Sequence, residues 1–169
     1  MNGIEVLRDG FGRVQGTVHA AVSGLSAEQL NHRPGERANS IAWLVWHLTR
    51  VQDDHVAEVA DREQVWTAAG WVQRFALDLD PAETGYGHDS AAVAAVRVDD
   101  PQLLVDYYDA VHSQTLQFLT GISDADLDRI VDRQWDPPVT LGVRLVSVID
   151  DDAQHGGQAA FLRGLLERR

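Results

Sequence analysis

Cysteine and lysine are both missing from this 169-residue sequence. The absence of cysteine excludes disulfide bonds, thiolate zinc sites and cysteine nucleophiles. All 14 basic residues are arginine, so a lysine Schiff base and a lysine general base are excluded as well. A metal site in this chain would therefore have to be built from histidine, aspartate and glutamate side chains.

Long hydrophobic runs are also missing. No stretch approaches the roughly 18 apolar residues that suggest a membrane span. The opening segment, MNGIEVLRDGFGRV, lacks the apolar region of a signal peptide. We therefore expect a cytoplasmic protein that does not enter a membrane. Positive charge is scarce too: a net charge of −12 argues against a nucleic-acid partner, because phosphate binding needs a basic surface.

The remaining composition is that of an ordinary globular protein. Apolar residues make up 44% of the chain and charged residues 24%, which favours neither disorder nor a fibrous structure. The length suits one compact domain with a real core, and we expect a single domain over residues 1–169.

Apolar residues recur at helical spacing in four long segments, and no segment shows sustained strand-like alternation. Asn39 or Ser40 is a suitable N-cap for the second helix, and Pro101 suits the first turn of the third. These features predict an all-α four-helix bundle. The expected helices cover residues 4–25, 41–61, 101–121 and 141–167.

Two connections between these helices contain proline, glycine or capping residues that predict specific local structure. The long one between the second and third helices should hold a short helical piece from Val65, then a loop, then another short helix near Ser90. Long ordered loops are often functional, so this one could cover a site. Before the last helix, Ser123 caps a turn, and Pro137 with Pro138 predicts a non-helical crossing.

The centre of the last helix, DDDAQHGGQ, carries the residues with the most chemistry. At about 100° per residue, Asp151 and His155 fall in the same apolar sector as Val148. Asp152 lies towards the edge of that sector, and Asp150 and Gln154 point away from it. The two glycines that follow, Gly156 and Gly157, weaken a helix and suggest that a neighbouring group approaches closely.

A buried carboxylate one turn from an imidazole needs compensation, and a divalent metal supplies it. By spacing alone, an ion pair between Asp151 and His155 or a cap on a neighbour explains the pattern as well. The leading third ligand is His47, in the apolar run WLVWHLTR, although a half-buried structural histidine also fits there. His55 competes with it, and Asp54 is placed to orient a ligand.

Histidines elsewhere in the chain have weaker claims to such a site. The two in the first and third helices suit structural roles, and His88 could approach a site only if the long loop folds over it. The sequence shows no phosphate-binding glycine loop, serine nucleophile elbow or EF-hand. The two helical histidines are His19 and His112, and the two in predicted loops are His32 and His88.

Three segments together resemble the DinB-like superfamily, and most closely its branch related to mycothiol-dependent maleylpyruvate isomerase and mycothiol S-transferases. They are RPGERANSIAWLVWHLTRVQDD, then WVQRFALD with TGYGH downstream, and WDPPVTLGVRLVSVIDDDAQHGGQAAFLRGLL. The resemblance spans nearly the whole chain. It implies a four-helix bundle, often a homodimer, with a divalent metal held by three side chains.

The resemblance also implies which residues hold the metal. A histidine in the second long helix of the family matches His47, and a pair of ligands at i and i+4 in the last helix matches Asp151 and His155. Many relatives have histidine where Asp151 stands, whereas the thiol-transferase branch tends to have an acid, usually glutamate. Two imidazoles and a carboxylate suit zinc first, with nickel as a competitor.

Three functions follow from such a centre. The leading one is a transferase or isomerase in which the metal activates a low-molecular-weight thiol, such as mycothiol, against a small electrophile. Metal-dependent hydrolysis is the alternative, with Asp54 or Asp152 as general base, and a non-catalytic, metal-stabilised helical module is another. Candidate anchors for an anionic substrate are Arg74, Arg144 and Arg163.

Overall fold

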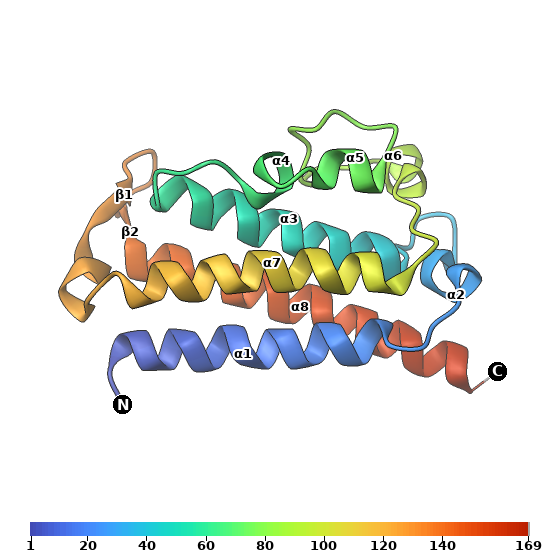
Figure 1. Cartoon of the computed structure of the whole chain (residues 1–169), viewed down its shortest axis with the longest axis horizontal. Coiled ribbons are helices and arrows are strands. Elements are labelled where there is room, and N and C mark those ends of the chain that lie inside the picture. Colours follow the sequence, from blue (N-terminus) through green and yellow to red (C-terminus); the bar gives the residue numbers. More distant parts are fainter. Residues whose placement is uncertain (169) are drawn as a thin grey trace.

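The computed structural model describes residues 1–168. Its four longest helices run side by side (Figure 1), so the predicted all-α bundle is confirmed. Each packs on two neighbours in the order α1, α8, α3, α7 and back to α1. Traced by colour in Figure 1, α1 and α8 run in one direction and α3 and α7 in the other. The helices are α1 (Gly3–Val22), α3 (Ile41–Val59), α7 (Pro101–Thr120) and α8 (Leu141–Glu167).

The starts of two long helices agree with their sequence signals. The Ser40 side chain accepts a hydrogen bond from the main-chain N–H of Trp43, so Ser40 and not Asn39 is the cap of α3. Pro101 occupies the first turn of α7, as predicted. Two ends fall short of the expected bounds, because α1 stops at Val22 before the positive-φ Gly24, and α3 stops at Val59.

The connection between α3 and α7 contains more helix than the sequence indicated. It holds α4 (Val65–Ala68), α5 (Trp71–Phe75) and α6 (Ser90–Ala95), where we expected only two helical pieces. A further short helix, α2 (Ala27–Asn31), precedes α3 and was not predicted. These segments are too short for a periodic signal, and α4 and α5 lie over α3 in Figure 1.

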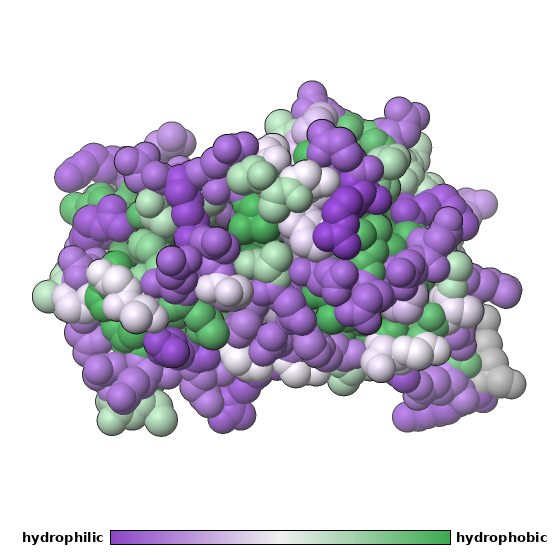
Figure 2. All heavy atoms as spheres, in the orientation of Figure 1, coloured by the Kyte–Doolittle hydropathy of each residue, from purple (hydrophilic) through white to green (hydrophobic). Residues whose placement is uncertain are grey.

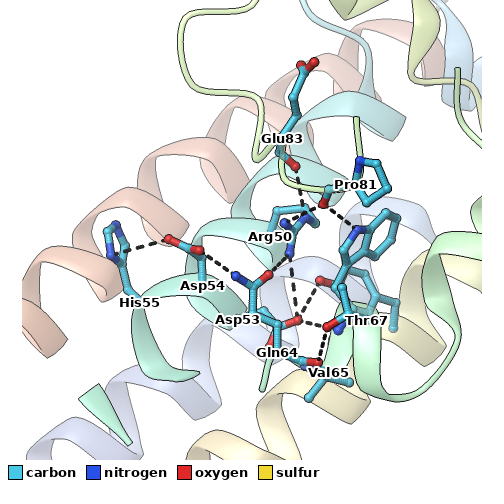
Figure 3. Close-up of polar contacts among 11 residues, drawn as sticks. Arg50, Asp53, Asp54, His55, Gln64, Val65, Thr67, Pro81 and Glu83 are labelled. Carbon is cyan, nitrogen blue, oxygen red and sulfur yellow. Dashed lines mark hydrogen bonds and ion pairs between the residues drawn. The ribbon is translucent and has the colours of Figure 1, made fainter. Parts of the chain in front are cut away.

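A buried ion pair on α3 anchors this connection (Figure 3). The Asp53 carboxylate accepts hydrogen bonds from the main-chain N–H groups of Val65 and Trp66, at 2.9 and 2.8 Å, and from the Tyr107 hydroxyl at 3.0 Å. Arg50 lies 4.0 Å from that carboxylate and is fully enclosed. The first turn of α4 is thereby tied to the middle of α3.

Arg50 also holds the far part of the connection. Its guanidinium donates to the Gln64 side chain at 2.6 Å and to the main-chain carbonyls of Pro81 and Glu83 at 3.4 and 3.2 Å. The same group lies over the Trp66 ring, 5.0 Å from its centre. One buried arginine therefore fixes the chain at two places, around residues 64 and 81–83.

The crossing before α8 is a 3₁₀ turn followed by a small hairpin. The Asp126 carboxylate accepts from the main-chain N–H and the hydroxyl of Ser123, so the predicted turn is confirmed. The hairpin strands are too short to give an alternating pattern, which is why the sequence did not reveal them. The elements are η1 (Asp124–Asp128), β1 (Ile130–Asp132) and β2 (Val139–Thr140).

Apolar packing between the helices forms the core, with Trp46, Tyr107 and Tyr108 among its largest enclosed side chains. On the face drawn in Figure 2, polar residues cover much of the surface and apolar ones are scattered between them. Within residues 1–168, no helix is long and apolar enough to cross a membrane.

Candidate metal centre

The three side chains predicted as ligands meet where α3 packs against α8. One ligand atom from each of His47, Asp151 and His155 can be chosen so that all three lie within 4.8 Å of one another. His47 is buried, at 6% exposure, and the two residues of α8 are half-buried. The helical spacing of four residues and the α3–α8 contact together produce this cluster.

The ring of His47 is oriented by the main chain of the long connection. Its Nδ1 lies 2.6 Å from the carbonyl oxygen of Thr84. A carbonyl only accepts, so Nδ1 carries the hydrogen and Nε2 keeps its lone pair for a metal. The ring also stacks on Trp43, with centres 4.6 Å apart. We predicted that Asp54 would orient a ligand, but its carboxylate instead accepts from the Gln64 amide at 2.7 Å.

The segment that carries the Thr84 carbonyl passes very close to the imidazole. Gly85 has a φ of +98°, and a Cβ placed on it would lie 2.6 Å from His47 Nδ1. The loop is closed by His88, which accepts from Trp43 Nε1 at 3.2 Å and bonds the Glu83 carboxylate at 2.6 Å. The long connection thus covers the cluster, and His88 braces that cover without joining the cluster.

On α8, a main-chain carbonyl likewise occupies one ring nitrogen of His155. Its Nδ1 donates to the main-chain carbonyl of Asp151 at 2.9 Å, which leaves Nε2 as the free nitrogen. The rings of His47 and His155 are 4.5 Å apart and nearly perpendicular. Both imidazoles therefore have Nε2 free. In metal sites the other ring nitrogen of a ligating histidine commonly donates a hydrogen bond, as Nδ1 does in both rings.

The Asp151 carboxylate fits a cation better than it fits its protein neighbours. Its Oδ2 lies 3.2 Å from His155 Nδ1, a close electrostatic contact without hydrogen-bond geometry. This oxygen is buried, and no group within residues 1–168 donates a hydrogen bond to it. A buried acceptor without a donor is costly, and a divalent cation would remove that cost. The donor set of two imidazoles and one carboxylate also suits zinc or nickel.

The charge states of the three groups agree with this fit. Burial lowers the pKa of His47, which keeps the ring neutral even though the Thr84 bond opposes the shift. Burial would raise the pKa of Asp151, but His155 and the other nearby histidines outweigh it and hold the pKa low. The Asp151 carboxylate in turn raises the pKa of His155. The cluster therefore pairs an ionised acid with imidazoles.

Asp152 corrects the helical-wheel prediction for α8. We placed it at the edge of the apolar sector, yet it is fully buried while Asp151 is only half-buried. The reason is that α8 packs against α1 on one side and α3 on the other, so its inward face is rotated from the one we assumed. Gly156 confirms the predicted close approach, with Thr17 3.1 Å from a Cβ placed there, whereas Gly157 has open space.

His55, the other histidine weighed for α3, lies outside the cluster. Its Nδ1 is 2.9 Å from Nη1 of Arg144 on α8. The histidines assigned structural roles also lie elsewhere: His19 pairs with Asp109 at 2.8 Å, and His112 is buried against Tyr108.

A cavity of about 650 Å³ opens beside the cluster. His47 and Asp151 form part of its wall, with His55 and Arg144 next to them. Its other lining residues include Val51, Val143 and Val148, and two strongly exposed aromatic side chains, Tyr86 and Trp135. A small molecule in this cavity would therefore touch candidate ligand atoms on one side and apolar side chains on the other.

Fold and cluster together define a helical-bundle protein with a candidate His–Asp–His metal centre at one interhelical contact. The model of the DinB superfamily matches residues 11–159, and the chain belongs to this superfamily of metal-binding proteins. A crystal structure of a conserved protein from Enterococcus faecalis is 32% identical, with a TM-score of 0.92, and the match covers 100% of this chain and 99% of that one. No functionally curated protein matched.

Proposed function

We propose that this protein is a metal-dependent transferase or isomerase that uses a low-molecular-weight thiol, of which mycothiol is the leading candidate. The observation that carries the proposal is the convergence of His47, Asp151 and His155 beside a cavity of about 650 Å³. The resemblance of the sequence to mycothiol-dependent enzymes supports the same reaction class.

The three residues would hold the metal with Nε2 of each imidazole and one carboxylate oxygen. A divalent metal with only three protein ligands keeps open positions, where it lowers the pKa of a bound thiol and holds the thiolate. Zinc is the metal we propose, with nickel as the competitor. The Thr84 carbonyl and the Asp151 main chain keep both rings in the orientation that this ligand set needs.

The cavity and the composition both favour an external sulfur nucleophile. The chain has no cysteine, so in a thiol-dependent reaction the sulfur would have to arrive with a cosubstrate. Val51, Val143 and Val148 would exclude water from one side of the thiolate, which strengthens the electrostatic interactions there. The remaining volume would admit a small electrophile beside the thiol.

The positions of the two candidate general bases argue against the hydrolytic alternative. Asp152 is enclosed in the core and does not line the cavity. Asp54 does line it, but one of its carboxylate oxygens is occupied by the Gln64 amide. A purely structural metal would not need the neighbouring cavity, so this feature favours a reactive centre.

Cobalt substitution tests the proposal directly. Titrating the cobalt-loaded protein with mycothiol should produce a sulfur-to-cobalt charge-transfer band that saturates. The band should be lost in His155→Ala, which removes a ligand, and kept in His19→Ala, which removes an imidazole outside the cavity. A cobalt-loaded wild-type protein that gives no such band would overturn the thiol-dependent reading.

A further inference from the structure

The contact between Arg144 and His55 fixes the tautomer of the histidine. Arg144 Nη1 lies 2.9 Å from His55 Nδ1. A guanidinium is always charged and can only donate, so Nδ1 of His55 must be the acceptor. The hydrogen of the neutral ring is therefore on Nε2. Burial lowers the pKa of His55, and the Arg144 charge lowers it further, which agrees with a neutral ring.

Arg144 is itself held in place from the opposite side. Its Nη2 donates to Asp132 of β1 at 3.0 Å, and both side chains are mostly buried. These two hydrogen bonds use only part of the five N–H groups of a guanidinium. The hairpin before α8 thus sets the position of Arg144, and Arg144 sets the hydrogen-bonding state of His55.

Both residues line the cavity that the candidate metal ligands line. His55 Nε2 is not buried and has no hydrogen-bond partner within residues 1–168. Two acids, Asp54 and Asp151, share this wall. Asp54 already accepts from Gln64, and Asp151 belongs to the candidate metal centre. Among the arginine and histidine side chains of this wall, His55 Nε2–H and the free N–H groups of Arg144 remain as donors for a ligand oxygen.

We propose that His55 and Arg144 form a carboxylate-binding subsite for the electrophilic substrate. This inference rests on the proposed function and narrows the substrate class to small electrophiles that carry a carboxylate. Charge-assisted hydrogen bonds from Arg144 would fix that group, and His55 Nε2–H would donate to one of its oxygens. The reactive carbon would then be held at a set distance from the metal centre.

The other two arginines considered as anchors are committed elsewhere. Arg74 lies over the Trp71 ring, 3.8 Å from its centre, and pairs with Asp106 at 3.4 Å. Arg163 donates to main-chain carbonyls at the end of α1, and neither arginine lines the cavity. Arg144 is thus the arginine whose position suits a substrate group.

The first test reads the tautomer. Long-range ¹⁵N–¹H spectra of the zinc-loaded protein, with labelled histidine and His55→Gln for assignment, should show His55 as the neutral Nε2–H form at pH 8. Arg144→Met should release it into a mixture of tautomers. An Nδ1–H tautomer or a protonated ring in the wild-type protein would overturn the proposal.

The second test uses succinate, an unreactive dicarboxylate, as the probe. Binding to the zinc-loaded protein should shift the His55 Nε2 resonance. It should weaken about ten- to a hundredfold in both Arg144→Met and His55→Phe, as expected for lost hydrogen bonds to a charged group. His55→Gln keeps an N–H donor and should recover part of the affinity. Arg74→Gln, which breaks a surface pair, should bind like the wild type.

These results remain separable from those of the thiol experiment. Neither Arg144 nor His55 belongs to the ligand cluster, so the cobalt–thiol band should survive in both variants. Succinate binding without a thiol band would overturn the proposed function and keep the subsite. Absence of saturable succinate binding, or equal binding in Arg144→Met, His55→Phe and the wild type, would overturn the subsite.

Discussion

The carbonyl oxygen of Thr84 lies 2.6 Å from Nδ1 of His47, and this contact decides which nitrogen of the imidazole can reach a metal. The carbonyl belongs to the connection between α3 and α7, whereas the histidine belongs to α3 itself. The geometry of the cluster therefore depends on a loop that contributes no ligand atom.

Replacing Gly85 with alanine should weaken metal binding. The added Cβ would lie 2.6 Å from His47 Nδ1, so either the ring or the loop must move. Loss of such a supporting contact typically lowers metal affinity about 10- to 100-fold. Competition with a chromogenic chelator would measure the change. Gly87→Ala is the matched control, because its φ is also positive but nothing lies within 4 Å. Equal losses in both variants would contradict the steric explanation.

Zinc should stabilise the protein, and removing one candidate ligand should abolish the effect. A metal that binds only the folded state adds about 2.7 kcal/mol when its free concentration is 100 times Kd. We expect the melting temperature of the chelator-treated wild type to rise with zinc, and that of His47→Ala to stay constant. His32→Ala changes a histidine of the loop before α3 and should respond like the wild type. A zinc response in His47→Ala equal to that of the wild type would exclude His47 as a ligand.

The buried pair of Arg50 and Asp53 should be far more important for stability than a surface pair. Asp53→Asn leaves the enclosed Arg50 charge without its counter-charge, and breaking such a pair costs about 3 kcal/mol or more. Asp106→Asn breaks an exposed pair with Arg74 and should cost about 1 kcal/mol or less. Urea unfolding of both variants gives the comparison. Similar costs for the two variants would show that the negative charge of Asp53 contributes no more to stability than that of an exposed pair.

Acid should destabilise the fold partly through His112. Burial lowers the pKa of this imidazole, while Asp109 and His19 act on it in opposite directions. At a pH below the pKa of His112 in the unfolded chain, the unfolded state binds a proton at this imidazole and the folded state does not. The free energy of unfolding therefore decreases as the pH falls from neutral.

His112→Gln should therefore lose less stability than the wild type between pH 7.5 and pH 5.5. Urea unfolding at the two pH values, with chelator present so that metal affinity does not contribute, measures the difference. A variant that loses as much stability as the wild type over this interval would show that His112 is not the titrating group.

The sequence predicted the helices well because their signals are local. Ser40, Pro101 and the apolar spacing of each long segment act within a few residues of the chain. The short helices and the β1–β2 hairpin were missed or underestimated, because segments of two to six residues have no measurable period. Their existence depends on distant partners, such as Asp53 for the first turn of α4.

For the candidate site, too, the sequence pointed to some of the groups and not to others. His47, Asp151 and His155 could be named from their residue types, from the spacing on α8 and from the family resemblance. The Thr84 carbonyl could not be named, because a main-chain group has no sequence signature. The inward rotation of Asp152 was likewise hidden, since it depends on how α1 and α3 divide the surface of α8.

Arg50 ties the chain at Pro81 and Glu83 to the same helix that carries His47. Because Arg50 and His47 are three residues apart on α3, the helix and the loop over the cluster are held together next to the candidate ligand. Metal exchange would then be gated by detachment of that cover rather than by separation of the helices. The rate of metal dissociation would then equal the rate of a local opening of this loop, during which the four-helix bundle stays folded.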